Sequence, residues 1–242
     1  MNKTTLTLFL LLFTFASFAQ EAIKVTNYNA AKINEIDLQF EYPELVRINT
    51  WDQKEVKITA DVFINDGEDN EKFQIDSQIR GGFLIINSEI KGIDEYNNYS
   101  INRDTDEEGM QITRNGTTIS KNGKWRKNSI IISVRLEIMV PKGMDVKIDA
   151  RYGIVEVLSN DISLDIEARY GGVDIMVDEK MDLDIMAKTQ WGQIYHNLDA
   201  KLKADGEGAP GKWMQTAASL NRATKKLYAE SQYGNVYLRK NN

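Results

Sequence analysis

Four short copies of one pattern hold the residues of this sequence that are best suited to chemistry at a surface. Each copy has a small residue, a polar residue, an aromatic residue and a glycine, at positions 150–153, 168–171, 189–192 and 231–234. A flat ring beside a hydrogen-bond donor suits the binding of a sugar ring, and ring stacking inside the fold is the structural alternative. The candidate binding or structural ladder consists of Arg151, Tyr152, Arg169, Tyr170, Gln190, Trp191, Gln232 and Tyr233.

Catalytic chemistry has weaker support. Asp149 and Glu167 hold the same position in successive copies and would align as a carboxylate pair, although alternating charge on a solvated strand face also explains them. The only histidine, His196, falls where the other copies have apolar residues, which predicts a core or rim position. The sequence has no cysteine and no phosphate-binding or nucleophile motif. We therefore expect no catalytic residues and no cofactor.

One acidic stretch, from Asn65 to Glu71, has the oxygen-rich composition that hard cations prefer. Its ligand spacing does not match that of an EF-hand loop, and its asparagine, aspartate and glycine residues are typical of a solvated turn. The acidic residues at 104–108 have the same explanation. We expect no metal site in either stretch.

The residues around each glycine alternate as in a β-strand. In the first copy Val146, Ile148 and Ala150 precede the glycine at every second position, and Val155 and Val157 follow it. A period of two places these side chains on one face of a strand. The glycines are 18, 21 and 42 residues apart, so the last gap equals two periods with one degenerate copy between them. This repeat predicts an all-β fold, a β-solenoid with coils of 18–21 residues, one ring per coil and the glycine at a bend.

The composition divides the chain into four parts. Residues 1–19 have the basic start, apolar stretch and small final residues of a signal peptide. Residues 20–95 are predicted to form an N-terminal β portion, either a less regular antiparallel sheet or wider coils, with strands at 33–41, 45–51, 55–64, 72–80 and 83–90. A protruding polar insertion is expected at 96–128, with hairpin arms at 110–113 and 117–120. The repeats occupy 129–242, and residues 20–242 are expected to form one continuous domain.

The charge pattern indicates which partners are disfavoured. The formal net charge is −6, and acidic residues are interspersed with basic ones, which argues against binding to nucleic acid. No stretch after the signal peptide reaches the ~20 apolar residues that a membrane-spanning helix needs. We expect an exported protein, located in the periplasm, at the outer surface or in the medium. The last strand, near Tyr237 and Leu238, is expected to be an open edge and therefore a candidate dimer contact.

Two segments resemble a known family. The run from Val46 to Ile58 is similar to the segment that opens an exported bacterial family classed as adhesins. The run from Ile138 to Gly143, which leads into the aromatic–glycine repeats, is similar to the second half of that family. The family is related to the GIN-type head domains of autotransporter adhesins, and the junction at 17–20 resembles leaders common in Bacteroidetes. The resemblance covers most of the mature chain, implies a β-solenoid or β-roll, and provides no catalytic residues.

The predicted function is therefore that of a non-catalytic, adhesin-like protein of the cell envelope or surface. Its repetitive β face would bind a glycan or a protein. A periplasmic accessory or sensor scaffold in envelope homeostasis is the alternative. A polysaccharide-active β-helix enzyme is the third interpretation.

Overall fold

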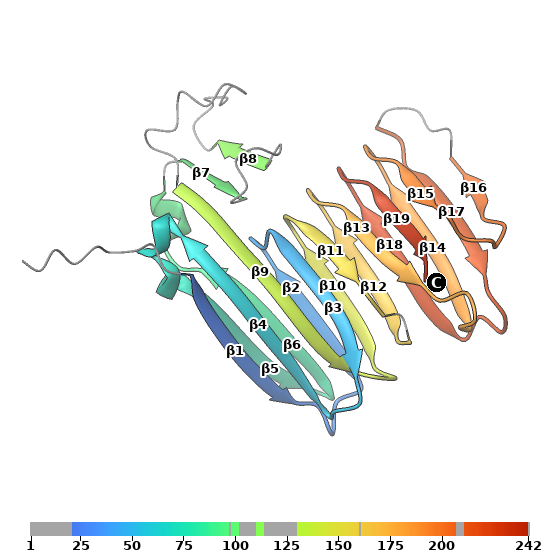
Figure 1. The fold of residues 1–242 in the computed structure, drawn as a ribbon, viewed down its shortest axis with the longest axis horizontal. Coiled ribbons are helices and arrows are strands. Elements are labelled where there is room, and N and C mark those ends of the chain that lie inside the picture. The colour runs from blue at the N-terminus through green and yellow to red at the C-terminus, as the bar shows by residue number, and fades with distance from the viewer. Residues whose placement is uncertain are drawn as a thin grey trace, which may run out of the picture.

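The chain folds into two mixed β-sheets that pack face to face (Figure 1). The computed structural model describes residues 21–96, 98–101, 110–113, 130–159, 161–206 and 211–241. The predicted signal peptide, the hairpin arm at 117–120 and the acidic run at 104–108 lie outside these residues. The prediction of an all-β fold is confirmed.

Sheet A has ten strands. Its main path runs in the order β1, β4, β9, β3, β11, β13, β19 and β15, and β7 pairs with β9 and with β8. The bounds are β1 Ala22–Asn29, β3 Leu45–Trp51, β4 Glu55–Ile64, β7 Asn98–Ile101, β8 Met110–Thr113, β9 Ile130–Pro141, β11 Ile154–Val157, β13 Val173–Val177, β15 Ile194–His196 and β19 Val236–Lys240.

Sheet B has nine strands, in the order β16, β17, β14, β18, β12, β10, β2, β6 and β5. The bounds are β2 Glu35–Phe40, β5 Phe73–Arg80, β6 Phe83–Ile90, β10 Asp145–Ala150, β12 Ser163–Ala168, β14 Leu183–Thr189, β16 Lys203–Asp205, β17 Met214–Ser219 and β18 Lys225–Ser231. Three short 3-10 helices, η1 Asn65–Gly67, η2 Asn70–Lys72 and η3 Ile93–Glu95, lie in the connections.

The predicted N-terminal strands at 45–51, 55–64 and 83–90 match β3, β4 and β6, and those at 33–41 and 72–80 contain β2 and β5. Strand β1 was not predicted. Its inward positions include Lys24 and Thr26, whereas Ile23 and Val25 point outward and are 62% and 55% exposed. Because the apolar residues lie on the outer face, the usual alternation does not identify this edge strand.

Each repeat contributes one strand to each sheet, and neighbouring repeats pair in parallel. Strand β10 pairs with β12 so that Lys147 lies beside Asp165, which is the register predicted from the motif. Strands β2 and β3 pair in the same parallel way with β10 and β11. Parallel pairing thus begins within the N-terminal portion, and β1, β4 and β5 add antiparallel strands beside it.

The spatial order of the repeats differs from their order in the sequence. Strand β18 lies between β12 and β14, and β19 lies between β13 and β15, so the fourth copy is inserted between the second and the third (Figure 1). The prediction of a degenerate coil before it is wrong, because β16 and β17 form an antiparallel pair at the edge of sheet B. The pairing energy of near-identical repeats does not depend on their sequence order, so spacing alone does not reveal the insertion.

This insertion also overturns the expected open edge near the C-terminus. Val236 and Leu238 are 0% exposed, and β19 has a paired strand on each side. The edge of sheet A is β15 instead. Neither residue is available as a dimer contact.

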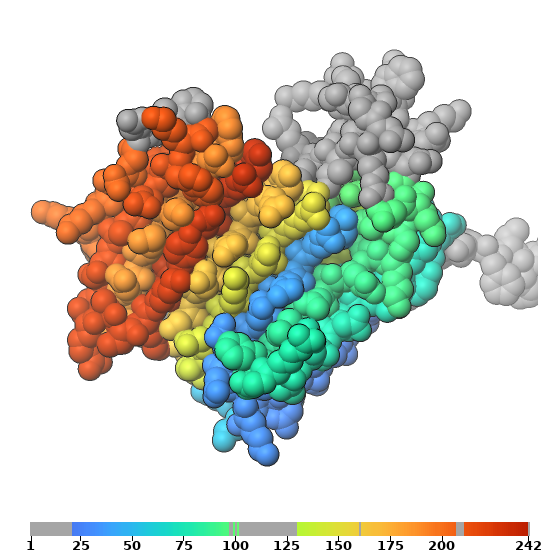
Figure 2. Space-filling model, turned by 180° about the vertical axis from the view of Figure 1, so that it is seen from behind, coloured from blue at the N-terminus to red at the C-terminus, as the bar shows by residue number. Residues whose placement is uncertain are grey.

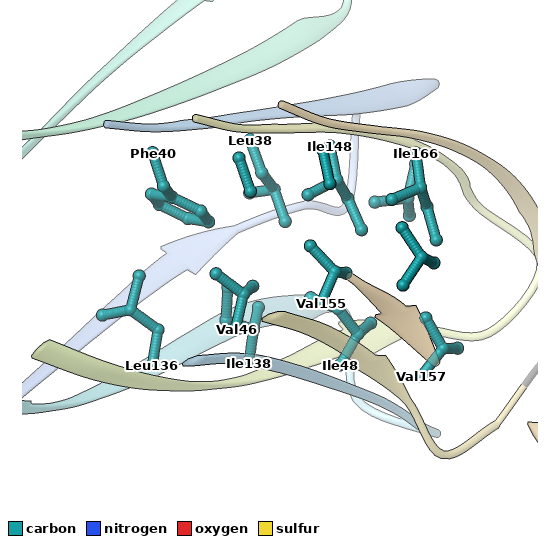
Figure 3. Close-up of a cluster of buried hydrophobic side chains, with 14 of the residues drawn as sticks. Leu38, Phe40, Val46, Ile48, Leu136, Ile138, Ile148, Val155, Val157 and Ile166 are labelled. Carbon is teal, nitrogen blue, oxygen red and sulfur yellow. The ribbon is translucent and has the colours of Figure 1, made fainter. Parts of the chain in front are cut away.

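The space between the sheets is filled by branched apolar side chains. Figure 3 shows Leu38, Ile148 and Ile166 pointing from sheet B toward Ile48 and Val155 of sheet A. Burying each such side chain contributes about 1.5–3 kcal/mol, so this continuous cluster stabilises both sheets. It extends from the N-terminal strands into the repeats, and the outward positions on the strands are left for charged and polar residues. Figure 2 shows one outer face, with blue β2 between green and yellow segments.

Candidate binding site at the aromatic corner

The glycines of the four copies lie on top of one another where the chain turns from sheet B to sheet A. A Cβ on Gly171 would lie 1.4 Å from the carbonyl oxygen of Gly153, and a Cβ on Gly234 would lie 2.2 Å from that of Gly171. On Gly192 it would lie 1.9 Å from the carbonyl oxygen of Gly234. The corner therefore requires glycine because backbones of neighbouring repeats touch there.

The small residue of the motif stabilises the same corner with hydrogen bonds in two of the four copies. This residue is Ser231 in the copy that ends at Gly234 and Thr189 in the copy that ends at Gly192, and both residues are 0% exposed. The Ser231 hydroxyl donates to the Gly171 carbonyl over 2.6 Å and accepts from the Gly234 amide over 2.8 Å. Thr189 repeats this arrangement with Gly234 and Gly192. The two earlier copies have alanine at this position and lack these hydrogen bonds.

The aromatic residues form one stack along the corner. The ring centroids of Tyr152 and Tyr170 are 5.1 Å apart, those of Tyr170 and Tyr233 are 5.2 Å apart, and those of Tyr233 and Trp191 are 6.5 Å apart. The first two spacings are close to the ~4.8 Å between hydrogen-bonded strands, so the backbone spacing brings the rings together. The stack follows the spatial order of the strands and places Tyr233 before Trp191.

A fifth ring, Tyr42, joins the stack and was missed. It stacks on Tyr152 at 5.6 Å, and Tyr99 of β7 contacts its edge at 6.0 Å. The signal was present in the sequence, since Ile36, Leu38 and Phe40 precede Tyr42 as apolar residues precede the other rings. Pro43 takes the place of the motif glycine, which hid this copy.

Exposure increases along the stack. Tyr152 is 9% exposed, Tyr170 36%, Tyr233 47% and Trp191 53%. The faces of the rings nevertheless lie against each other, with interplanar angles between 4° and 19°. A ligand at this corner therefore meets ring edges and hydroxyl groups, because the flat faces are occupied by neighbouring rings.

The stack ends against backbone. Gly211 lies so close to Trp191 that a Cβ there would be 2.8 Å from Cη2 of the indole, and the Gln190 amide donates to the Gly211 carbonyl over 3.0 Å. Trp213 follows in the chain and has Lys188 Nζ 4.8 Å from its ring centroid. The far side of Trp191 is thus covered at its benzene edge.

Burial raises the pKa of Tyr42 and Tyr152, with the surrounding charges as smaller contributions. For Tyr152 the main opposing influence is the guanidinium of Arg151, which lowers the pKa. Both phenols are therefore protonated at neutral pH and keep a hydroxyl donor.

The polar residues that precede the rings form a row beside the stack. Arg151 is paired with Glu41. The Gln232 amide donates to the Gln190 side-chain oxygen over 3.2 Å. Arg169 lies between these two pairs, and the residues that the structure describes give its guanidinium no hydrogen-bonding or ionic partner. The structure thus brings all eight sequence-predicted residues to one corner.

A second row of charges crosses the outer face of sheet B. Asp149 lies beside Glu167, and Glu167 lies beside Glu230. Lys147 Nζ is 3.8 Å from Glu167, Lys188 Nζ is 2.9 Å from Glu230, and Lys226 Nζ is 2.6 Å from Asp165. Most of these carboxylates are therefore paired with lysines across strands, at a few tenths of a kcal/mol to about 1 kcal/mol for each exposed pair.

His196 is exposed on the edge strand of sheet A, so the core alternative of the prediction is wrong and the rim alternative stands. It lies in register with buried Leu238, but β15 is the last strand of sheet A and no further strand covers it.

In the acidic stretch before β5, the Asp69 carboxylate is bound by neighbouring residues of the protein. It accepts hydrogen bonds from Tyr96 and Asn65 over 2.7 Å each and lies 3.0 Å from Lys72 Nζ. Within the described ranges no group of three or more histidine or acidic residues is arranged to hold a metal ion.

Neither the family models nor the curated proteins match this sequence. Among solved structures, a "putative cell adhesion protein" of Clostridium sporogenes ATCC 15579 covers 92% of this chain and 100% of its own, with 10% identity and a TM-score of 0.52. A "putative adhesin" of Bacteroides fragilis NCTC 9343 covers 92% and 99%, with 10% identity and a TM-score of 0.20. Among the described residues, the structure has no helix of the length and apolarity needed to cross a bilayer. The chain shares its fold with the Clostridium protein.

Proposed function

We propose that this chain is an exported, non-catalytic, adhesin-like protein that binds a glycan or a protein at the aromatic corner. Its parallel repeats would act as a β-solenoid, a rigid support that holds identical groups at fixed intervals. The signal-peptide pattern at 1–19 supports export. The fold shared with a protein described as a "putative cell adhesion protein" is consistent with this role.

One observation carries the proposal: the exposed part of the ring stack lies beside a row of hydrogen-bonding side chains. The ring centroid of Tyr233 is 5.2 Å from that of Tyr170 and 6.5 Å from that of Trp191, and all three residues are exposed. Arg169 and Gln232 lie next to them. Aromatic residues with a polar tip and arginine are enriched where proteins bind partners, because they combine apolar area with directed hydrogen bonds. A corner built from touching backbones holds these groups without a further loss of entropy on binding.

The carboxylates on sheet B support a non-catalytic role. Asp149 and Glu167 are in-register neighbours on adjacent parallel strands, so both project in the same direction from the sheet. A pair that cleaves a glycosidic bond must flank that bond from two sides. Glu167 also has Lys147 Nζ 3.8 Å away. Alternating charge on a solvated face therefore explains these residues better than acid–base chemistry does.

The test is a binding screen of the mature protein against arrays of glycans and extracellular proteins. The informative variant is the double substitution Tyr170→Phe and Tyr233→Phe, which keeps the ring stack and removes two exposed hydroxyls. We expect at least a several-fold weaker signal for a retained ligand, because each lost hydrogen bond costs about 0.5–1.5 kcal/mol. Tyr152→Phe makes the same change in a buried ring of the same stack and should leave binding unchanged.

The proposal fails if no glycan or protein is retained, or if the double variant binds as well as the wild type. Protease treatment of intact and lysed host cells tests the location separately. Cleavage on intact cells supports a surface protein. Protection until lysis supports the periplasmic alternative, and the search for a partner then moves to envelope proteins.

A further inference from the structure

A polar pocket of about 380 Å³ lies on the outer face of sheet B, next to the aromatic corner. Its walls come from the ends of four neighbouring strands, β6, β2, β10 and β12, and from the residues that follow them. Gln39, Asn87 and Asp149 form one side, where they occupy the same register on successive strands. Arg151 and Arg169 form the side toward the ring stack.

The cationic side of this pocket has one guanidinium available for a ligand. Arg151 is held by Glu41, which lines the same pocket. Arg169 is exposed and has no ionic or hydrogen-bonding partner among the residues described. A planar guanidinium with free donors binds a carboxylate through two parallel hydrogen bonds.

The opposite side offers acceptors that are equally unused. Asp149 is exposed, and no hydrogen bond or ion pair engages its carboxylate within the described residues. The Oδ1 atom of Asn87 is buried and has no hydrogen-bond partner. Because that atom has almost no surface open to solvent, a ligand hydroxyl does not reach it, and the acceptor that a ligand meets on this side is the exposed Asp149 carboxylate. The unused donor and this unused acceptor therefore converge on one pocket.

The required ligand has a carboxylate for Arg169 and hydroxyl groups for Asp149. A dianionic phosphate fits poorly, because Arg169 balances only one of its two charges and Asp149 and Glu41 also line the pocket. A neutral sugar leaves Arg169 unpaired. The volume is at the small end of the range for ligand pockets, which suits one unit of a longer chain.

We propose that this pocket binds one acidic sugar unit, with its carboxylate on Arg169 and its hydroxyls on Asp149. The proposal rests on the glycan-binding function proposed above and names the class of glycan. Uronates of polysaccharides and terminal sialic acids share this chemistry. The neighbouring edges of Tyr170 and Tyr233 then face the next units of the same chain.

The experiment is calorimetric titration of the mature protein with a hexamer of uronic acid. Its methyl ester and maltohexaose serve as uncharged probes, and sialyllactose against lactose tests the second source. We expect binding of the uronate or of sialyllactose, with at least tenfold weaker binding of the uncharged counterpart. Arg169→Ala should weaken acidic-sugar binding at least tenfold, and Arg169→Lys should recover part of it.

Arg80→Ala is the matched control, because Arg80 is an exposed arginine at the end of β5, where it pairs with Phe83 at the start of β6. It should bind as the wild type does. Asp149→Ala should weaken binding several-fold, and circular dichroism checks that each variant is folded. Arg169→Gln replaces Arg169→Ala if the latter unfolds.

Three outcomes would overturn the pocket proposal: no binding of any acidic probe, equal binding of the ester, or full binding by a folded Arg169 variant. If the wild type retains a protein or a neutral glycan in the array screen, the proposed function stands and only the pocket assignment fails. If the arrays retain nothing, the proposed function itself has failed.

Discussion

The two ends of the sheets are built in different ways. At the N-terminal end the strands are long, with ten residues in β4 and twelve in β9, and β1 directs Lys24 inward toward the carbonyls of Asn70 and Phe73. At the C-terminal end the edge strands β15 and β16 have three residues each. Exposed aromatic residues gather there, including Trp191, Tyr195 and Trp213.

The N-terminal edge strand is protected against pairing with another chain, whereas the C-terminal end exposes aromatic residues to solvent. An inward charge on an edge strand prevents the pairing of another chain, because the charge would lose its solvation or its partners. Burial lowers the pKa of Lys24, opposed by the nearby Glu71, which shows that its amine is partly withdrawn from water. The C-terminal end carries no comparable inward lysine on β15, whose residues are half-buried or exposed. The C-terminal half therefore holds the exposed part of the ring stack, whereas the polar pocket lies between β6 and β12, nearer the N-terminal end.

The largest effect is expected from a charge placed inside the C-terminal half. Leu238→Asp would bury a carboxylate between β13 and β15 and should lower the free energy of unfolding by about 4 kcal/mol or more. Tyr237→Asp changes the neighbouring residue on the outer face of the same strand and should cost about 0.5–1.5 kcal/mol from the lost stack on Tyr195, with the new charge left in water. Urea unfolding measures both. Equal losses would show that the strand is not buried as described.

The next effect distinguishes the middle of the ring stack from its end. Tyr170 has a ring on each side, so Tyr170→Ala should lower the free energy of unfolding by about 1–3 kcal/mol beyond the lost area. Trp191 has one stacked neighbour, and Trp191→Ala should lose about 0.5–1.5 kcal/mol from stacking. Thermal unfolding compares the two. A greater loss for Trp191 would contradict the order of the stack.

A smaller effect is expected at the corner hydroxyl. Ser231→Ala removes one buried donor and one buried acceptor, and the Gly171 carbonyl loses its partner, at a cost of about 1–3 kcal/mol. The fold should persist because Ala150 and Ala168 occupy the same position in the earlier copies. Hydrogen exchange should show faster opening near Gly234 and unchanged protection in β10. A change spread over both halves would argue against a local role.

The smallest effect concerns acid sensitivity at the N-terminal end. Burial raises the pKa of Asp69, but hydrogen bonds from Tyr96, Lys72 and Asn65 outweigh it and hold the pKa below its usual value. Because the folded pKa is lowered, this stabilisation is present above the unfolded pKa of ~3.9 and is lost as pH falls through the folded value. Unfolding of wild type and Asp69→Asn between pH 7 and 2 should therefore converge at the acid end. A constant difference would exclude the linkage.

Much of the fold follows from local pattern. Strands β3, β4 and β6 were predicted at their observed bounds, because alternating burial and turn residues define them within the sequence. The register of Lys147 beside Asp165 followed from aligned motifs. The stacking sequence of the repeats did not follow, since pairing depends on contacts between distant segments that similar sequences can make equally well.

The candidate site was predictable in part. The motif identified the residues of the corner, but Tyr42 was hidden by Pro43 in place of glycine. The pocket was not predictable, because Asn87 reaches it from β6, outside the repeats. Whether a polar group in the pocket has a hydrogen-bonding partner depends on which residues the fold places beside it. The exposure of His196 likewise depends on which strand is last in the sheet.

The position of β18 and β19 has a consequence for how the protein is made. These strands are synthesised after the two repeats that they separate. A chain that stops before Lys225 lacks the segment that divides β12 from β14. The observed strand order is therefore reached only after β18 and β19 have been made, and stepwise folding in chain order would have to leave a position open for them between β12 and β14 and between β13 and β15.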